Sequence, residues 1–270
     1  MNRITLIILL LFSSNLVYSQ SEQNENKHYS NTYLGLGGII TSFQDLKSSN
    51  IQYNGIGGAF NFGYEKQKRN LFGISLDLLL SQEKAKTNHI GKLFMANAIL
   101  SSKYLTPVLN NGNAQLFVGG TWDVVDINFR NYNWLNNSAI TYISNSGIKL
   151  STLYIKTLSS NLKLDLGLDF QLFGFVKEGP GFALIENQTM LEKGEFSYLD
   201  WRNALPYTLK YYNFEPFWDY VNLTTALKLH YKKRWAFSYR WNVQRSHRLE
   251  NYPLTKGYNL VSVIYKLSNK

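Results

Sequence analysis

The chain has 270 residues, of which 28 are basic and 18 acidic, so its formal net charge is +10. It contains no cysteine, which excludes a lipid anchor on cysteine, disulfide bonds and thiolate metal sites. Aromatic residues are abundant, with 19 Tyr, 16 Phe and 6 Trp, yet the mean hydropathy is slightly negative. This combination is expected when alternate residues face lipid and a polar interior.

The first residues have the features of a secretory signal peptide. Arg3 gives a positive start, and the apolar run at 4–12 is shorter than the roughly 20 residues that a transmembrane helix needs. Small residues predict cleavage between Ser19 and Gln20. We therefore expect three parts: a signal peptide over 1–19, a flexible periplasmic leader over 20–31 and one barrel domain over 32–270.

Strict alternation of apolar and polar residues dominates the rest of the chain. In residues 162–173, large apolar side chains alternate with lysine, aspartate, glycine and glutamine, and 70–81 and 235–244 repeat the pattern. A helix has a period of 3.6, so these segments are strands, and they are long enough to cross a bilayer, which takes about 9–11 residues. The predicted strands are 32–44, 53–65, 70–82, 91–104, 113–127, 146–158, 161–175, 219–231, 235–246 and 256–267.

The connections between these strands alternate in length. The short ones are 66–69, 105–112, 159–160 and 232–234, and the others have eight or more residues, one of them more than forty. This rhythm predicts a transmembrane antiparallel up-and-down β-barrel of about ten strands, with short periplasmic turns and long outer loops. A further hairpin within 176–218 would make twelve strands, but Pro206 and Pro216 favour a loop there.

The sequence resembles outer-membrane β-barrel proteins of the Bacteroidota. The resemblance lies in the signal sequence ending Tyr18-Ser19-Gln20 before a polar leader, in loops rich in asparagine and lysine, and in the alternating strands. It covers the whole chain, but it is one of type, without a family-specific motif. It implies export to the outer membrane of a Gram-negative bacterium and carries over no functional residue.

Aromatic residues near the predicted strand ends are expected to form two girdles at the membrane interfaces. The inner girdle would contain Tyr64, Phe72, Tyr104, Tyr231, Trp235 and Tyr265. The outer girdle would contain Phe43, Phe94, Phe175, Phe217, Trp218 and Tyr258.

The polar faces of the strands predict a charged lumen. The expected lumen network is Asp77, Asp123, Lys149, Lys163, Asp165, Asp169, Lys228, His230 and Arg240. A barrel of ten strands is narrow, and an unpaired buried charge is costly, so we expect ion pairs to plug most of the lumen. A small-solute channel of the porin type is the alternative.

Some residues near the predicted outer rim are of types that occur in active sites. Ten strands also occur in the omptin proteases, and Asp123, Asp126, Ser246 and His247 are of residue types that serve as bases and nucleophiles. Residues three apart, or adjacent, point to opposite faces of a regular strand, so neither pair forms a site. We expect no enzyme, with an omptin-like or lipid-modifying hydrolase as a second alternative.

The sequence predicts no cofactor and no metal site, because the four histidines lack ligand spacing. For an exported protein, the basic excess does not indicate nucleic acid. The expected partners are outer-membrane lipid, lipopolysaccharide phosphates near the outer loops, and a protein at the outer loops or the periplasmic turns. The basic residues expected in outer loops are Lys84, Lys86, Lys193, Arg245 and Arg248.

The leading prediction of function is a structural or partner-binding role through the outer loops. The longest of them, within 176–218, is rich in aromatic residues, which are enriched in protein interfaces. The possible contact surface is Trp201, Tyr207, Tyr211, Tyr212, Phe217 and Trp218.

Overall fold

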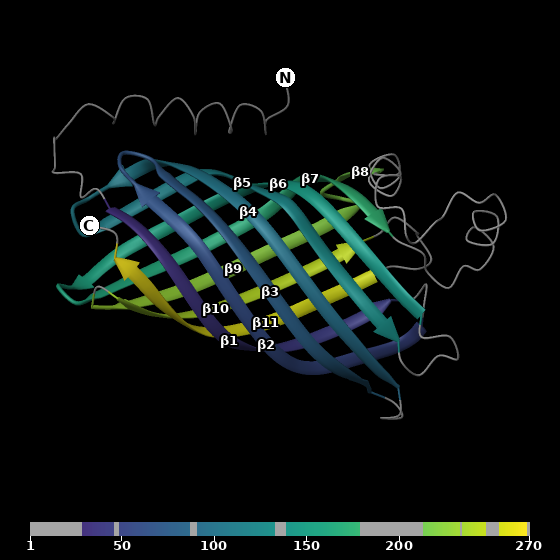
Figure 1. The fold of residues 1–270 in the computed structure, drawn as a ribbon. Coiled ribbons are helices and arrows are strands. Elements are labelled where there is room, and N and C mark those ends of the chain that lie inside the picture. Colours follow the sequence, from purple (N-terminus) through teal and green to yellow (C-terminus); the bar gives the residue numbers. More distant parts are fainter. Residues whose placement is uncertain are drawn as a thin grey trace, which may run out of the picture.

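The structure is a computed structural model that describes residues 29–45, 49–86, 91–132, 139–178, 213–232, 234–246 and 254–268. Ten long strands form a closed antiparallel barrel (Figure 1). The wall strands are β1 (Tyr29–Asp45), β2 (Ser49–Gln67), β3 (Leu71–Ala85), β4 (Lys92–Asn110), β5 (Ala114–Tyr132), β6 (Ala139–Ser159), β7 (Leu162–Glu178), β9 (Tyr220–Tyr231), β10 (Trp235–Ser246) and β11 (Leu254–Ser268).

Neighbours in the wall are mostly neighbours in the sequence, as in an up-and-down barrel. The order runs β6-β5-β4-β3-β2-β1-β11-β10-β9-β7, and the pairing of β6 with β7 closes the ring. The first and last strands pair along their whole length, from Asn31 opposite Ser268 to Asp45 opposite Leu254. Every backbone edge of the wall is thereby paired, and the predicted fold class is confirmed with ten strands.

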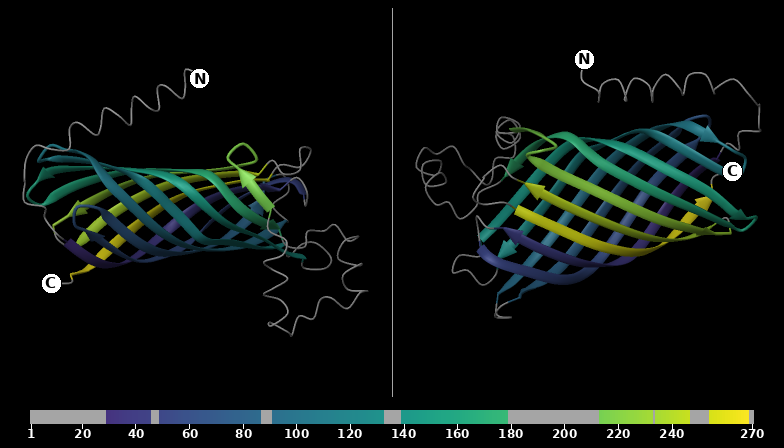
Figure 2. Two further views of the ribbon diagram at one scale, coloured as in Figure 1. Left: turned by 90° about the horizontal axis from the view of Figure 1, so that it is seen from above. Right: turned by 180° about the vertical axis from the view of Figure 1, so that it is seen from behind.

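The twelve-strand alternative is wrong for the wall. Within the described part of 176–218, the last residues of β7 are followed by one further strand, β8 (Asn213–Pro216), which pairs with the end of β7. Along β7, the residues that pair with β8 follow those that pair with β9. Phe170 lies opposite Leu223 of β9, and Phe173 lies opposite Pro216 of β8. Figure 2 shows β8 at one end of the barrel, where it extends the wall without adding to the ring.

Several strands are longer than the hydrophobic pattern predicts. β1 begins at Tyr29, so residues 29–31 of the expected leader lie in a strand, and β6 begins at Ala139 instead of 146. The hydrogen-bond ladder continues where the apolar alternation fades. β4 continues past Pro107, which has no N–H to donate to the ladder. The register with β5 shifts between Pro107 and Leu109, as is common where proline lies in a strand. The predicted signal peptide and residues 20–28 lie outside the described residues.

The two ends of the barrel differ. The short connections join β2 to β3, β4 to β5, β6 to β7 and β9 to β10, and we call this the turn end. β1 begins and β11 ends there too (Figure 1). The opposite end, where the connections from β1 to β2, β3 to β4, β5 to β6, β7 to β9 and β10 to β11 lie, is called the loop end. Among the described residues, no helix is long and apolar enough to cross a membrane.

The outer surface of the wall carries an apolar belt. Exposed members on three neighbouring strands are Leu36, Ile40, Ile56, Phe60, Phe62, Phe72, Ile74, Leu78 and Leu80. Toward the loop end polar residues join the exposed aromatic ones on the outer surface, as at Asn54, Gln82, Lys84, Lys92 and Arg245. The prediction that Phe43 and Tyr258 belong to the outer girdle is wrong. Their side chains are 1% and 3% exposed, because their positions in the alternation face the lumen.

Glycine permits a close approach between the strands at one inward position. A Cβ atom added to Gly57 of β2 would lie 1.9 Å from the carbonyl oxygen of Leu80 in β3. Its outward neighbour Gly58 has no atom within 4 Å of such a Cβ. Gly57 is therefore required by the packing of the wall, as its position inside a predicted strand suggested.

Candidate functional site: the lumen network

A β-bulge in β5 decides which acidic side chains enter the lumen. Between Asp123 and Asp126 the register shifts, so that three steps along β5 match two steps along β6, from Gly147 to Asn145. Asp123 and Asp126 therefore both point inward and are 1% and 3% exposed. The expectation that they face opposite sides at the rim is wrong, since β5 continues to Tyr132 and both lie within the wall.

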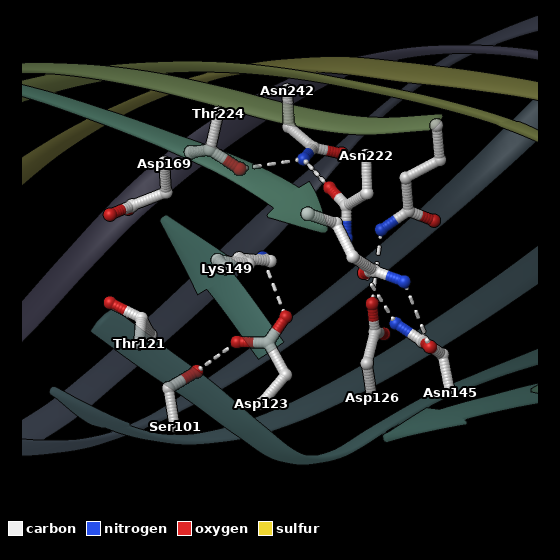
Figure 3. A network of polar contacts seen from close by, with 12 residues as sticks. Ser101, Thr121, Asp123, Asp126, Asn145, Lys149, Asp169, Asn222, Thr224 and Asn242 are labelled. Carbon is white, nitrogen blue, oxygen red and sulfur yellow. Dashed lines mark hydrogen bonds and ion pairs between the residues drawn. The ribbon is translucent and has the colours of Figure 1, made fainter. Parts of the chain in front are cut away.

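Asp123 forms the closest ion pair between neighbouring strands. The Nζ of Lys149 in β6 lies 2.5 Å from its Oδ2, and Ser101 donates a hydrogen bond of 2.8 Å to its Oδ1 (Figure 3). Lys103 of β4 pairs with Asp169 of β7 at 3.2 Å, across the two strands between them. The partner of Asp169 is a lysine that the sequence analysis did not select.

Two contacts cross the lumen between distant parts of the wall. Arg240 of β10 forms an ion pair with Asp77 of β3, which also accepts a hydrogen bond from Asn61. Gln244 of β10 donates a hydrogen bond of 3.0 Å to Asp126 of β5. In both cases three wall strands lie between the partners along the ring. We call these contacts the cross-lumen ties, because they occupy the interior that an open pore would need.

A third charged group lies toward the turn end. Asp165 of β7 contacts His230 Nε2 at 2.6 Å and Lys163 Nζ at 3.7 Å. Lys228 places its ammonium 5.3 Å from the ring centroid of Tyr33, within the range of a cation–π contact. All nine predicted lumen residues therefore lie in polar or cation–π contacts of the interior.

Amide side chains form a layer between these charges and the loop end (Figure 3). Gln171 is fully buried, exchanges hydrogen bonds with Asn145 and accepts one from Asn222 at 3.2 Å. Asn242 donates to Asn222 at 2.9 Å and to Thr224 at 2.8 Å. These residues join β6, β7, β9 and β10, so that the layer spans one side of the interior.

Apolar side chains gather inside the barrel at the loop end. They come from the loop-end parts of nine wall strands, and we call them the loop-end cluster: Phe43, Tyr53, Ala85, Leu93, Met95, Tyr132, Ile143, Val176, Tyr220 and Leu254. Tyr53 and Tyr132 meet edge to face with their ring centroids 6.0 Å apart. Arg130 adds its guanidinium 5.3 Å from the ring centroid of Phe43. The sequence analysis missed this cluster, because inward apolar residues were not expected.

A polar cavity of about 170 Å³ remains inside the barrel. It extends from Glu65 and Leu71, near the turn end, to Asp126 and Gln244 at one of the cross-lumen ties. Charged inward residues that the sequence analysis did not select are Glu65, Glu83, Lys103, Asp126, Arg130 and Lys256. Their positions in the alternation could have identified all except Asp126 and Arg130, which lie beyond the bulge.

Part of the predicted contact surface can be located. Phe217 and Trp218 follow β8 and are 44% and 63% exposed, with their rings 4.9 Å apart. Trp201, Tyr207, Tyr211 and Tyr212 lie outside the described residues. Across the described ranges, no group of three or more His, Asp or Glu side chains could hold a metal ion.

Comparisons with known proteins give likenesses of shape only. No family model matches the chain, and no curated protein matches its sequence. Its structure is similar to the outer membrane protease OmpT from Escherichia coli, with 10% identity, 93% of this chain and 99% of that chain covered, and a TM-score of 0.45.

Two further solved structures have similar coverage. The translocator domain of the autotransporter NalP from Neisseria meningitidis has 10% identity, 97% of each chain covered and a TM-score of 0.43. The outer membrane protein OprG from Pseudomonas aeruginosa has 9% identity, 90% of this chain and 98% of that chain covered, and a TM-score of 0.34. None of these likenesses assigns a function, and the fold assignment rests on the strand pairing.

Proposed function

We propose that the protein is an integral outer-membrane barrel with a closed lumen and a structural or partner-binding role at its loop end. The observation that carries the proposal is the occupied interior. The cross-lumen ties and the loop-end cluster lie one after the other along the barrel axis. Wall strands that bury charges inside and expose an apolar belt outside are the arrangement expected in lipid.

The partner is proposed from the surface at the loop end. Exposed Phe214, Phe217 and Trp218 offer the aromatic area that protein interfaces favour. Lys84, Lys92 and Arg245 lie just beyond the apolar belt, where lipopolysaccharide phosphates would accept their hydrogen bonds. The Bacteroidota origin stays a prediction, as does the absence of catalysis.

Conductance in planar bilayers tests the closed lumen. The refolded protein, inserted into a bilayer that contains lipopolysaccharide, should produce no stable single-channel openings. A porin of known conductance, inserted in the same bilayer, serves as the positive control. Stable openings of the unmodified protein would overturn the proposal in favour of the small-solute channel.

A further inference from the structure

The outer surface at the turn end carries basic side chains without acidic partners. Six basic residues are exposed there, at the ends of β2 and β6 and in two of the short connections: Lys66, Lys68, Arg69, Lys156, Lys232 and Arg234. In the described ranges, none of them has a carboxylate oxygen within 4 Å. Glu65 and Asp165, the acidic residues described at this end, line the lumen cavity instead. The outer surface of the turn end is therefore cationic.

The cations between β9 and β10 contact aromatic side chains of the wall. The ammonium of Lys232 lies 5.3 Å from the ring centroid of Tyr231, and Arg234 donates a hydrogen bond of 3.3 Å to the hydroxyl of Tyr265. The ring of Tyr265 meets that of Trp235 edge to face, with the centroids 5.0 Å apart. Tyr231 and Trp235 are each 45% exposed on the outer face. Both cations therefore lie at the rim of the outer face, next to its aromatic side chains.

The same arrangement occurs where β2 meets β3. Lys66 lies opposite Phe72, which lies opposite Tyr104 of β4. Residues opposite each other in an antiparallel ladder share a face, and Phe72 and Tyr104 are 37% and 54% exposed. From Phe72 the apolar belt continues along β3 through Ile74 and Leu78. Cationic, aromatic and apolar zones thus follow one another along the wall.

This order of zones matches one leaflet of a lipid bilayer. Tyrosine and tryptophan lie preferentially at the level of the headgroups, next to the hydrocarbon. Cations just beyond them lie at the depth of the lipid phosphates, and basic residues near an anionic lipid surface are attracted to it. A soluble partner would need cations directed away from the bilayer, whereas Lys232 and Arg234 contact outward-facing tyrosines. We propose that the turn end enriches anionic phospholipids around the barrel, in the leaflet where it lies.

Short-range fluorescence quenching at one labelled site tests this proposal. The chain has no native cysteine, so Leu267→Cys, an exposed position of β11 near the turn end, takes a single bimane label. The full barrel is reconstituted in phosphatidylcholine vesicles that contain a minor fraction of nitroxide-labelled lipid. The probe is phosphatidylglycerol, and the control lipid is phosphatidylcholine with the same labelled chain. Both leaflets have the same composition, so the direction of insertion does not matter.

The anionic lipid should be enriched beside the label by about twofold or more over the control lipid, because several basic residues act together. In about 1 M salt, where the Debye length is about 3 Å, the two lipids should quench almost equally. A preference for phosphatidylglycerol that salt does not reduce would contradict recognition by charge.

A matched pair of triple variants locates the cations. The test variant removes three from the turn end: Lys66→Gln, Lys232→Asn and Arg234→Gln. Asparagine is used at position 232 because φ there is 53°, in the left-handed region that asparagine tolerates. The control variant removes the same charge from exposed positions at the loop end: Lys84→Gln, Lys92→Gln and Arg245→Gln. The test variant should lose the preference and the control should keep it, whereas an equal loss in both would contradict the placement.

The inference rests on the membrane placement of the proposed function, and the outcomes separate the two. Equal quenching by both lipids at low salt would overturn the inference and leave the membrane barrel intact. Absence of quenching by either lipid would overturn the membrane placement as well. Both results come from the chain without the charge substitutions, so they decide the matter even if a triple variant fails to fold.

Discussion

Arg240 and Asp77 illustrate how single side chains hold distant parts of the wall together. Asp77 is 5% exposed, and its ion-pair partner comes from β10, which three wall strands separate from β3 around the ring. Pairing offsets much of the desolvation of both charges, but a single charge left in the interior has no such compensation. The pair should therefore show strong coupling between its two members.

We expect Arg240→Met to destabilise the barrel by about 3–5 kcal/mol, because it leaves the Asp77 carboxylate buried without its cation. The double variant Arg240→Met, Asp77→Leu should recover much of this loss. Urea unfolding in detergent, followed by tryptophan fluorescence, measures both. A double variant that is as unstable as the sum of the single variants would contradict direct coupling.

Gly57 gives a second prediction for a single residue. Gly57→Ala should cost about 1–3 kcal/mol of unfolding free energy, because its Cβ would overlap the Leu80 carbonyl oxygen at 1.9 Å. Gly58→Ala is the matched control, since its Cβ meets no atom within 4 Å. The same unfolding measurement applies, and equal stability of the two variants would show that β2 and β3 can separate at little cost.

At the level of strands, the bulge in β5 reverses which alternate residues face inward. Before it, inward residues have odd numbers, as at Thr121 and Asp123, and after it they have even numbers, as at Asp126 and Asn128. Trp122 has an even number and Phe129 an odd one, yet both side chains face outward and are 49% and 47% exposed. A regular strand would place them on opposite faces.

Cysteine labelling tests this reversal, because the chain has no native cysteine. In liposomes, Trp122→Cys and Phe129→Cys should both react with a lipid-soluble maleimide, since both side chains face lipid. Asn128→Cys, whose side chain is buried inside, should remain unlabelled under the same conditions. Labelling at only one of the two outward positions would mean that β5 is regular.

The same bulge explains what could be predicted from the sequence and what could not. Strict alternation over residues 70–81, 162–173 and 235–244 located their strands and charged faces, because each period-two run has one lipid-type face. It could not reveal an extra residue within a strand, so Asp126 was assigned the wrong face. The contact partners across the lumen could not be predicted either, because no local sequence pattern indicates which strands face each other across a ring.

In the proposed closed lumen, two barriers lie in series along the whole barrel. The loop-end cluster is apolar and contains the fully buried Tyr53 and Tyr132, whereas the cross-lumen ties are polar. An ion that passed one barrier would still meet the other. Removing either barrier alone should therefore leave the barrel closed.

This arrangement predicts a specific pattern of conductance. Tyr53→Ala with Tyr132→Ala should show no stable openings, and neither should Arg240→Ala with Asp77→Ala and Gln244→Ala, which removes both ties. The variant with all five substitutions should conduct ions in a planar bilayer, while Phe72→Ala with Phe237→Ala, which changes only exposed outward residues, should not. Openings in a variant that lacks only one barrier would show that the two barriers are not independent.

The length of the wall strands has a consequence for how far the wall would extend beyond a membrane. β6 has 21 residues, which at about 3.4 Å each make a strand of roughly 70 Å. Tilted by about 45°, it rises roughly 50 Å, about twice the height of a typical apolar band of ~25 Å. Some outward residues near the loop end are polar, such as Lys84, Lys92 and Arg245. A wall of this height would extend well beyond the apolar band of a membrane, so the rim at the loop end would stand clear of the lipid.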